Sequence, residues 1–101
     1  MWNLTSTKLK NGYHAYFYRT QTGAEVDLCI AKGNEIVAVL EIKLSNNPKI
    51  SRGNTEAISD LKCATNFIIT FSPADYQLNE NWKVCNIDAV YSHLKLLNVV
   101  A

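Results

Sequence analysis

The fold is decided by residues 25–43, which read EVDLCIAKGNEIVAVLEIK. Two runs of mostly β-branched and aliphatic residues, 26–30 and 36–42, lie on either side of Lys32-Gly33-Asn34. A short polar segment that contains glycine, between two such runs, is typical of the turn of a β-hairpin. The stretch therefore predicts two neighbouring antiparallel strands.

Both strands carry charge where a strand interior normally has none. Glu25 and Asp27 flank Val26 on the first strand, and Glu41 and Lys43 flank Ile42 on the second. An ionised carboxylate removed from water without a partner is very costly, so some group must compensate these charges. A divalent cation held by Asp27 and Glu41, with Lys43 beside it, is the most economical explanation.

The register of the hairpin decides whether these charges meet. If the loop is centred on Asn34, facing residues sum to 68, so that Asp27 lies opposite Glu41 and Glu25 lies opposite Lys43. Facing residues share one side of a sheet, and side chains alternate along each strand. A loop of two or four residues would break the cluster, because a slip of one residue moves a side chain to the other face. The opposite face would then carry Val26, Leu28, Ile30, Leu40 and Ile42.

The rest of the chain predicts one α/β domain. Its 101 residues suffice for a single core, with residues 1–12 as an arm or helix remnant and residues 13–101 as the domain. The predicted order is β-β-β-α-β-β-α around a mixed sheet, because a crossover helix returns the next strand parallel. The predicted strands are 13–19, 25–31, 36–43, 67–71 and 82–85, and residues 72–81 form a polar loop. One predicted helix runs to about residue 64, with Asn54 or Thr55 as its cap. A second begins at Asn86 or Asp88, and its buried face comprises Ile87, Val90, Tyr91, Leu94 and Leu97.

Bulk properties exclude several classes of protein. Ten basic and nine acidic residues give no strong attraction to nucleic acid. The three cysteines (Cys29, Cys63 and Cys85) are widely spaced and odd in number, which indicates neither a disulfide framework nor a zinc knuckle. No signal sequence and no apolar run of membrane-spanning length occurs, so we expect a cytoplasmic protein without a membrane partner.

Three short motifs occur in a defined order, namely FYR at 17–19, GAEVD at 23–27 and EIKLS at 41–45. An acidic residue on the second strand, followed by Glu-x-Lys on the third, resembles the PD-(D/E)XK nuclease superfamily. The residues of the three motifs resemble those of the nuclease-like C-terminal domain of prokaryotic AAA-type ATPases. The role of that domain is poorly defined. The resemblance covers roughly residues 13–97.

This resemblance implies a restriction-endonuclease-like core and a metal-dependent nuclease that acts on DNA. Asp27, Glu41 and the backbone carbonyl of Ile42 would hold Mg²⁺ or Mn²⁺, which prefer oxygen ligands. Lys43 would orient or deprotonate the attacking water, or stabilise the negative charge that develops on the phosphate. Glu25 would be a supporting or substitute acid, unless it neutralises Lys43 across the hairpin.

Two departures from the family pattern bear on activity. The chain has no P-loop motif, so it binds no nucleotide by that route, and an ATPase domain would have to belong to a longer protein. The superfamily also places an acidic residue on a helix before the first strand, whereas residues 1–12 contain none. We interpret the chain as the C-terminal part of an AAA-type ATPase or a stand-alone relic of one.

Other interpretations of the same residues remain open. The central cluster also fits a solvent-exposed sheet face with cross-strand ion pairs between Lys43 and either Asp27 or Glu25. A second functional hypothesis is a catalytically inactive module of nuclease fold that serves regulation, homo-oligomerisation or partner binding. A third is nucleic-acid binding without cleavage, with help from Lys49, Arg52 and Lys62 or from stacking by the aromatic residues of 13–18.

Overall fold

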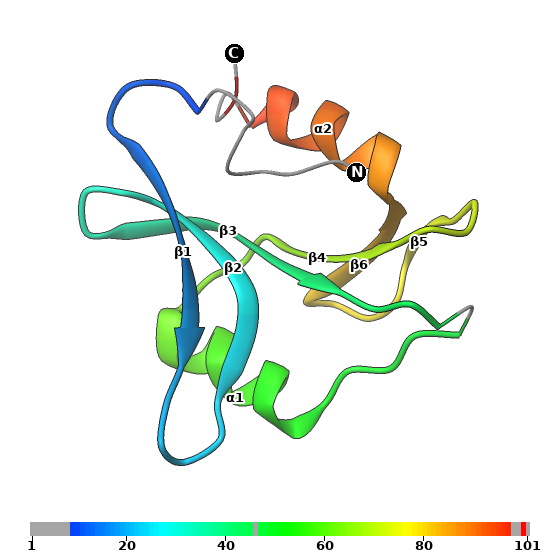
Figure 1. The fold of residues 1–101 in the computed structure, drawn as a ribbon, viewed down its shortest axis with the longest axis horizontal. Coiled ribbons are helices and arrows are strands. Elements are labelled where there is room, and N and C mark those ends of the chain that lie inside the picture. Colours follow the sequence, from blue (N-terminus) through cyan, green and yellow to red (C-terminus); the bar gives the residue numbers. More distant parts are fainter. Residues whose placement is uncertain (1–8, 46, 98–99, 101) are drawn as a thin grey trace.

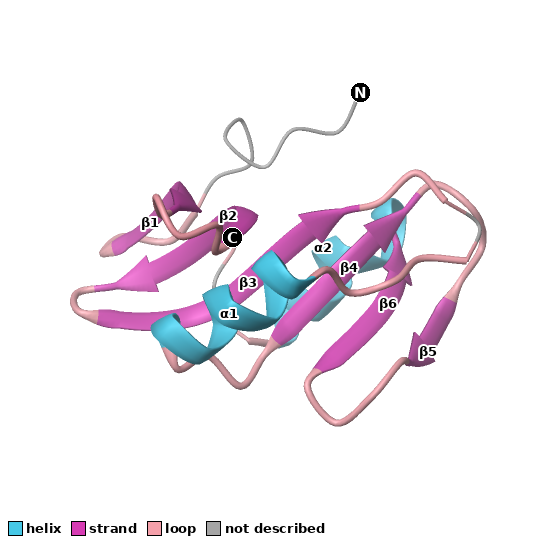
Figure 2. Ribbon diagram, turned by 90° about the horizontal axis from the view of Figure 1, so that it is seen from below, coloured by secondary structure: helices cyan, strands magenta, loops and turns pink. Residues whose placement is uncertain are grey.

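The computed structural model describes residues 9–45, 47–97 and 100 as one mixed sheet with a helix on each face. The elements are β1 (Tyr13–Arg19), β2 (Glu25–Lys32), β3 (Glu35–Ile42), α1 (Arg52–Leu61), β4 (Asn66–Thr70), β5 (Asp75–Gln77), β6 (Trp82–Asn86) and α2 (Ile87–Leu96). The strand order is β1-β2-β3-β4-β6-β5, and Figures 1 and 2 show α1 and α2 on opposite sides of this sheet.

The mixed character of the sheet confirms the sequence prediction. Strands β1, β2 and β3 form an antiparallel meander, after which α1 crosses over and β4 runs parallel to β3. Strand β6 is parallel to β4, and β5, which lies between them in the sequence, pairs antiparallel with the outer side of β6. The predicted α/β class is therefore correct. An antiparallel meander, β1 to β3, continues into β4 and β6, which run parallel to β3.

The predicted element order is wrong by one strand. Residues 72–81 were expected to form a polar loop, but they contain β5, whose three residues pair antiparallel with β6. All three residues of β5 are exposed. A short strand with no buried side chain has no apolar alternation, which is the signal on which strand prediction depends.

Two hydrophobic cores, one on each face of the sheet, hold the layers together. On the face covered by α1, the fully or almost fully buried residues are Ala24, Val26, Cys29, Val39, Ala57, Ile58, Cys63, Ile68, Trp82 and Val84. On the face covered by α2 they are Ile30, Ala38, Leu40, Phe67, Ile69, Cys85, Val90, Leu94 and Val100. Strand β4 is buried along its whole length because both helices pack against it, as its continuous apolar run predicts.

Helix α1 begins earlier than predicted. Ser51, and not Asn54 or Thr55, is its N-cap, because the Ser51 hydroxyl accepts from the Asn54 amide at 3.0 Å while the Asn54 side chain accepts from the Ser51 amide at 3.2 Å. Two helix-terminal donors are thereby satisfied at once. The helix ends at Lys62, whose left-handed backbone (φ 54°) stops it before the predicted Ala64.

Helix α2 follows the sequence prediction. Asn86 is its N-cap and accepts a hydrogen bond from the Asp88 amide at 2.8 Å. Val90 and Leu94 of the predicted apolar face are fully buried, whereas Leu97, predicted on the same face, is exposed at the C-cap. Of the predicted arm 1–12, residues 1–8 lie outside the described residues, and Leu9 forms an antiparallel bridge with Val100. Within the described ranges, neither helix is long and apolar enough to cross a membrane.

Candidate functional site

The β2–β3 hairpin has the predicted register, although its turn differs from the prediction. The pairs Leu28–Leu40, Cys29–Val39 and Ile30–Ala38 all sum to 68. The turn, however, contains only Gly33 and Asn34, because Lys32 already pairs with Glu35. A register shift between Ile30 and Ala31 adds one residue on β3 and restores the sum.

A second irregularity changes which residues share a face. Tyr16 pairs with Cys29 and Tyr18 pairs with Val26, so two residues of β2, Asp27 and Leu28, oppose the single residue Phe17. Such a β-bulge interrupts the strict alternation of side chains.

The predicted apolar face is therefore wrong at one end of the hairpin. Val26 is buried in the core beneath α1, whereas Leu28, Ile30 and Leu40 belong to the core beneath α2. Ile42 is exposed. The prediction assumed unbroken alternation along β2, and the bulge at Asp27–Leu28 removes it.

Asp27 and Glu41 are brought together, as the sequence predicts. The Asp27 amide donates to Glu41 Oε1 at 3.0 Å, and the Ile42 amide donates to Asp27 Oδ2 at 2.8 Å. The regular ladder between the two strands ends at Leu28–Leu40, so these carboxylates take the place of strand carbonyls as acceptors. Each carboxylate is thereby held at the end of the hairpin by the backbone of the other strand.

Lys43 contacts the more buried of the two carboxylates. Lys43 Nζ lies 3.2 Å from Glu41 Oε2, and Glu41 is only 8% exposed. The Lys43 amide donates to Ile69 O at 3.0 Å, which ties the residue to β4 just beyond the end of β3. Lys43 therefore compensates the charge of Glu41, a neighbour on its own strand segment, as a catalytic lysine permits. The predicted cross-strand pair is not seen among the described residues, because Lys43 contacts neither Asp27 nor Glu25 in an ion pair and Glu25 pairs with Arg19.

Glu25 lies elsewhere. It was predicted to face Lys43, but its register partner is Arg19 on β1, and Arg19 Nη2 lies 3.3 Å from Glu25 Oε2. The bulge moves Glu25 away from β3, because β2 pairs with β3 only as far as Leu28. Of the predicted acidic cluster, Asp27, Glu41 and Lys43 thus meet, and Glu25 does not join them.

Two residues of α1 contact or closely approach the segment that leads into β2. Asn54 is fully buried, and its side-chain amide donates to Glu25 O at 3.0 Å. Gly53 lies so close to the turn before β2 that an added Cβ would be 2.5 Å from Gly23 O. The polar pair Asn54-Thr55 carried the only sequence signal, and we interpreted it as a helix cap.

The donor atoms of the site fit a divalent cation only in part. Each carboxylate accepts a hydrogen bond from a backbone amide with one oxygen. The oxygens that remain as possible metal ligands are Asp27 Oδ1 and Glu41 Oε2, and Glu41 Oε2 becomes free only when Lys43 is displaced. Two carboxylates with water and phosphate oxygens suit Mg²⁺, which usually keeps several waters. Within residues 9–45, 47–97 and 100, no group of three or more His, Cys, Asp or Glu side chains could hold a metal.

The basic residues suggested for phosphate contact lie on and around α1. Arg52 Nε is 2.8 Å from Glu56 Oε1 within the helix, so its charge is already paired. Lys49 is exposed in the segment that precedes the helix, and Lys62 caps the far end. Lys49 and Arg52 thus lie at the N-terminal end of α1 and Lys62 at its C-terminal end.

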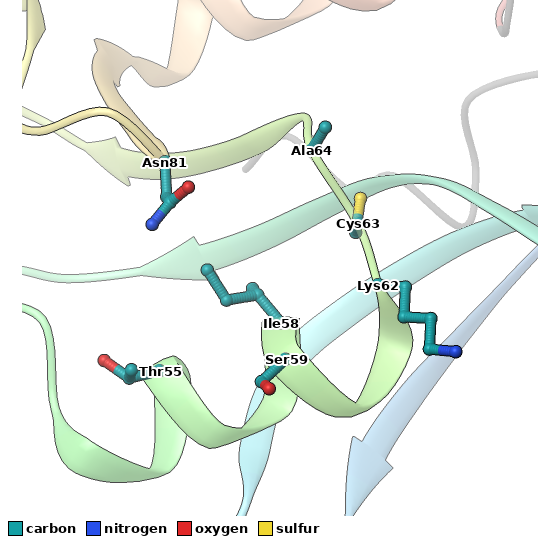
Figure 3. A pocket seen from close by; sticks show the side chains of 7 residues that line it. All are labelled: Thr55, Ile58, Ser59, Lys62, Cys63, Ala64 and Asn81. Carbon is teal, nitrogen blue, oxygen red and sulfur yellow. The ribbon is translucent and has the colours of Figure 1, made fainter.

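Two hollows of the described surface lie away from Asp27 and Glu41. One depression of about 370 Å³ lies between α1 and the loop before β6 (Figure 3), and it is lined by Thr55, Ile58, Ser59, Lys62, Cys63, Ala64 and Asn81. A second, of about 380 Å³, lies beside Asn66, Lys83, His93 and the end of α2. Neither is lined by Asp27, Glu41 or Lys43.

The three cysteines lie in the interior of the protein. Cys29, Cys63 and Cys85 are all buried and unpaired. Burial raises the pKa of the Cys29 thiol to about 12 and that of Cys85 to about 11. Burial also raises the pKa of Cys63, although its hydrogen bond to Thr65 O opposes the shift. These thiols stay protonated at neutral pH and are poor nucleophiles.

The fold and this site can now be compared with known proteins. A family model described as a domain of unknown function (DUF4143) matches residues 3–90. The chain therefore belongs to this family, and the match includes β1 to β6 with Asp27, Glu41 and Lys43. No curated protein and no solved structure matches the chain.

Proposed function

We propose that this chain is a metal-dependent phosphodiester hydrolase domain of PD-(D/E)XK type that acts on DNA. The observation that carries the proposal is the mutual hold between Asp27 and Glu41, with Lys43 Nζ 3.2 Å from Glu41. A carboxylate pair and an amine at the end of a hairpin are the groups that this chemistry requires. A restriction-endonuclease-like core is part of the same proposal.

In this proposal, Asp27 and Glu41 hold Mg²⁺ or Mn²⁺ through the oxygens that the backbone does not use, and the Ile42 carbonyl is a further ligand. The bound cation supplies Lewis-acid chemistry, lowering the pKa of water and offsetting phosphate charge. The Ile42 amide keeps the Asp27 carboxylate in place, since it donates to Asp27 Oδ2. Glu25 has no direct part, because it pairs with Arg19.

In this proposal Lys43 has two roles, one before the cation binds and one afterwards. While it contacts Glu41, it compensates a carboxylate that is 8% exposed. When Glu41 is neutralised by another positive charge, the Lys43 amine is released toward the substrate phosphate. There it orients or deprotonates the attacking water, or stabilises the negative charge of the transition state.

The biological setting follows from the same proposal. We propose that the domain is the C-terminal part of an AAA-type ATPase in the cytoplasm. Three buried cysteines without a disulfide suit a reducing compartment.

A second function is favoured by a specific observation, the contact between Lys43 and Glu41. An ion pair that is already satisfied, with only two carboxylates nearby, suits a nuclease fold that has lost catalysis and serves regulation, oligomerisation or partner binding. Such a module would keep the ion pair for stability and would need no metal.

A DNA-cleavage assay with matched variants separates the two functions. Supercoiled plasmid is incubated with the parent chain and Mn²⁺, and with Asp27→Asn, Lys43→Met and Glu35→Gln. Glu35 is an exposed acid at the opposite end of β3, and it serves as the control. Nicking by the parent and by Glu35→Gln, but not by the other two, supports the nuclease. Nicking by none of the chains rejects the nuclease and leaves the non-catalytic module. Equal nicking by all of them rejects Asp27 and Lys43 as the catalytic site.

A further inference from the structure

The two edges of the sheet differ in a way that indicates a partner for one of them. Strand β1 forms one edge and β5 forms the other. Strand β5 has three residues, Asp75, Tyr76 and Gln77, and a charge at its start. Strand β1 has seven residues, and no Lys, Arg, Asp or Glu occurs before its last one, Arg19.

Edge strands carry a row of unpaired N–H and C=O groups, and folded proteins usually protect them by shortness, charge or proline. By these criteria β5 is protected and β1 is not. No described segment other than β2 pairs with β1. The outer edge of β1 is therefore a template for another extended strand.

The side chains of β1 also favour a partner strand at this edge, because aromatic side chains are exposed on both faces of the sheet. Phe17 is 60% exposed and Tyr16 is 41% exposed. Tyr16 and Tyr18 pair with Cys29 and Val26 of the core beneath α1, so Phe17 between them lies on the α2 side. An added strand would cover aromatic surface on both sides of the sheet.

We propose that β1 pairs antiparallel with β1 of a second copy of this chain, forming a twofold-symmetric dimer with a continuous sheet. An antiparallel arrangement centred on Tyr16 uses all seven residues, and it places Ala15 opposite Phe17 of the other copy. Ala15 pairs with Ile30 of the core beneath α2, so Ala15 and Phe17 share that face. A small residue opposite an exposed ring leaves room for the ring to pack.

The charges favour this arrangement over a parallel one. Antiparallel pairing puts the two Arg19 residues at opposite ends of the strand pair, whereas parallel pairing would put them side by side. Each Arg19 is already compensated by Glu25 at 3.3 Å. Arg19 also lies over the Phe17 ring of its own chain, 5.5 Å from the ring centroid, and aromatic rings attract cations.

This dimer would be isologous, because the same strand is used by both copies. The dimer does not require metal binding or cleavage, so its test is independent of the test of the nuclease proposal. Since one pair of strands and no helix would form the contact, we expect an interface at the small, transient end of the range for protein pairs.

Sedimentation equilibrium of the parent, Phe17→Lys and Tyr76→Lys tests the dimer. Tyr76 is 40% exposed on β5, so its substitution is the matched control at the other edge. We expect concentration-dependent dimers for the parent and for Tyr76→Lys, and a monomer for Phe17→Lys with unchanged circular dichroism. A parent that is monomeric up to about 1 mM, a concentration at which association of about 4 kcal/mol is seen, would overturn the proposal.

Cross-linking tests the register. In the proposed dimer Tyr16 faces itself, and facing Cβ atoms lie about 4.5–5.5 Å apart, close to the range that a disulfide bridges. Mild oxidation should therefore join Tyr16→Cys chains but not Tyr76→Cys chains, while the three native thiols are buried. Equal cross-linking of both variants, or of neither, would contradict pairing through β1.

Discussion

Glu41 accepts a hydrogen bond from the backbone amide of Asp27 at 3.0 Å, and Asp27 accepts one from the amide that follows Glu41, that of Ile42, at 2.8 Å. Each acid thus fixes the strand that carries the other. Two carboxylates held this way keep their position without a cation. The arrangement therefore links the stability of the hairpin end to the chemistry that we propose for it.

Substitution of Asp27 should separate structure from metal binding. Asp27→Ala removes the acceptor of the Ile42 amide, and we expect a loss of about 1 kcal/mol in the free energy of unfolding. Asp27→Asn keeps an acceptor oxygen, so it should lose less. Urea unfolding of both variants and the parent measures the difference. Equal stability of all three would mean that the hydrogen bond to Ile42 contributes nothing.

Removal of the Lys43 charge should tighten metal binding. Lys43 competes with a cation for Glu41 Oε2, from which it lies 3.2 Å away. We therefore expect Lys43→Met to lower the Kd for Mn²⁺ several-fold, and Lys49→Met, a change of an exposed lysine outside the site, to leave it unchanged. Isothermal titration calorimetry gives both values. A weaker affinity in Lys43→Met would show that Lys43 supports the cation site instead of competing with it.

Gly53→Ala should destabilise the protein, contrary to the usual effect in a helix. Alanine is normally about 1 kcal/mol better than glycine within a helix. Here the new Cβ would lie 2.5 Å from Gly23 O, a backbone atom that cannot move away cheaply. We expect a net loss of about 1–3 kcal/mol, as in other overpacked sites. Ser59→Ala, at an exposed position of the same helix, is the control in thermal unfolding, and a stabilised Gly53→Ala would refute the close approach.

Asp75 should make stability depend on pH in acid. Its hydrogen bond to Lys83 and the nearby charges of Lys83 and His93 hold the pKa of Asp75 below its ordinary value. A lowered folded-state pKa stabilises the protein above the unfolded-state pKa, about 3.9, and this contribution disappears as the pH falls through the folded-state value.

The parent should accordingly be more stable than Asp75→Asn at pH 6, and the gap should close below about pH 4. Urea unfolding across this range, with Glu80→Gln as a neighbouring exposed acid, is the measurement. A gap that stays constant with pH would exclude the pair with Lys83 as its cause. Because Asp75 is largely exposed, salt should also reduce the gap.

The sequence predicts most of the fold because its signals are strong there. The apolar runs of β2, β3 and β4 and the cap at Asn86 each carry local patterns that match the structure. Strand β5 could not be predicted, because an exposed strand of three residues follows from its pairing with β6 and not from its own pattern. The start of α1 at Ser51 was missed because Asn54 is also a good cap residue.

At the site, the sequence correctly predicts that Asp27 and Glu41 lie close together, but the three-residue turn on which that prediction was based is wrong. The register sum of 68 holds because a shorter turn is offset by one extra residue on β3. The bulge opposite Phe17 has no sequence signal, and it turns Val26 to the other face and Glu25 toward Arg19. Bulges depend on the fit of strands to neighbours, so pattern alone does not place them.

Calorimetric titration of Mn²⁺ into the parent, Asp27→Asn, Glu41→Gln and Glu35→Gln tests the central claim most directly. The account predicts one saturable site in the parent and in Glu35→Gln, and none in the two substitutions at the hairpin end. Absence of binding to the parent, or equal binding to all four chains, would contradict a metal site between Asp27 and Glu41.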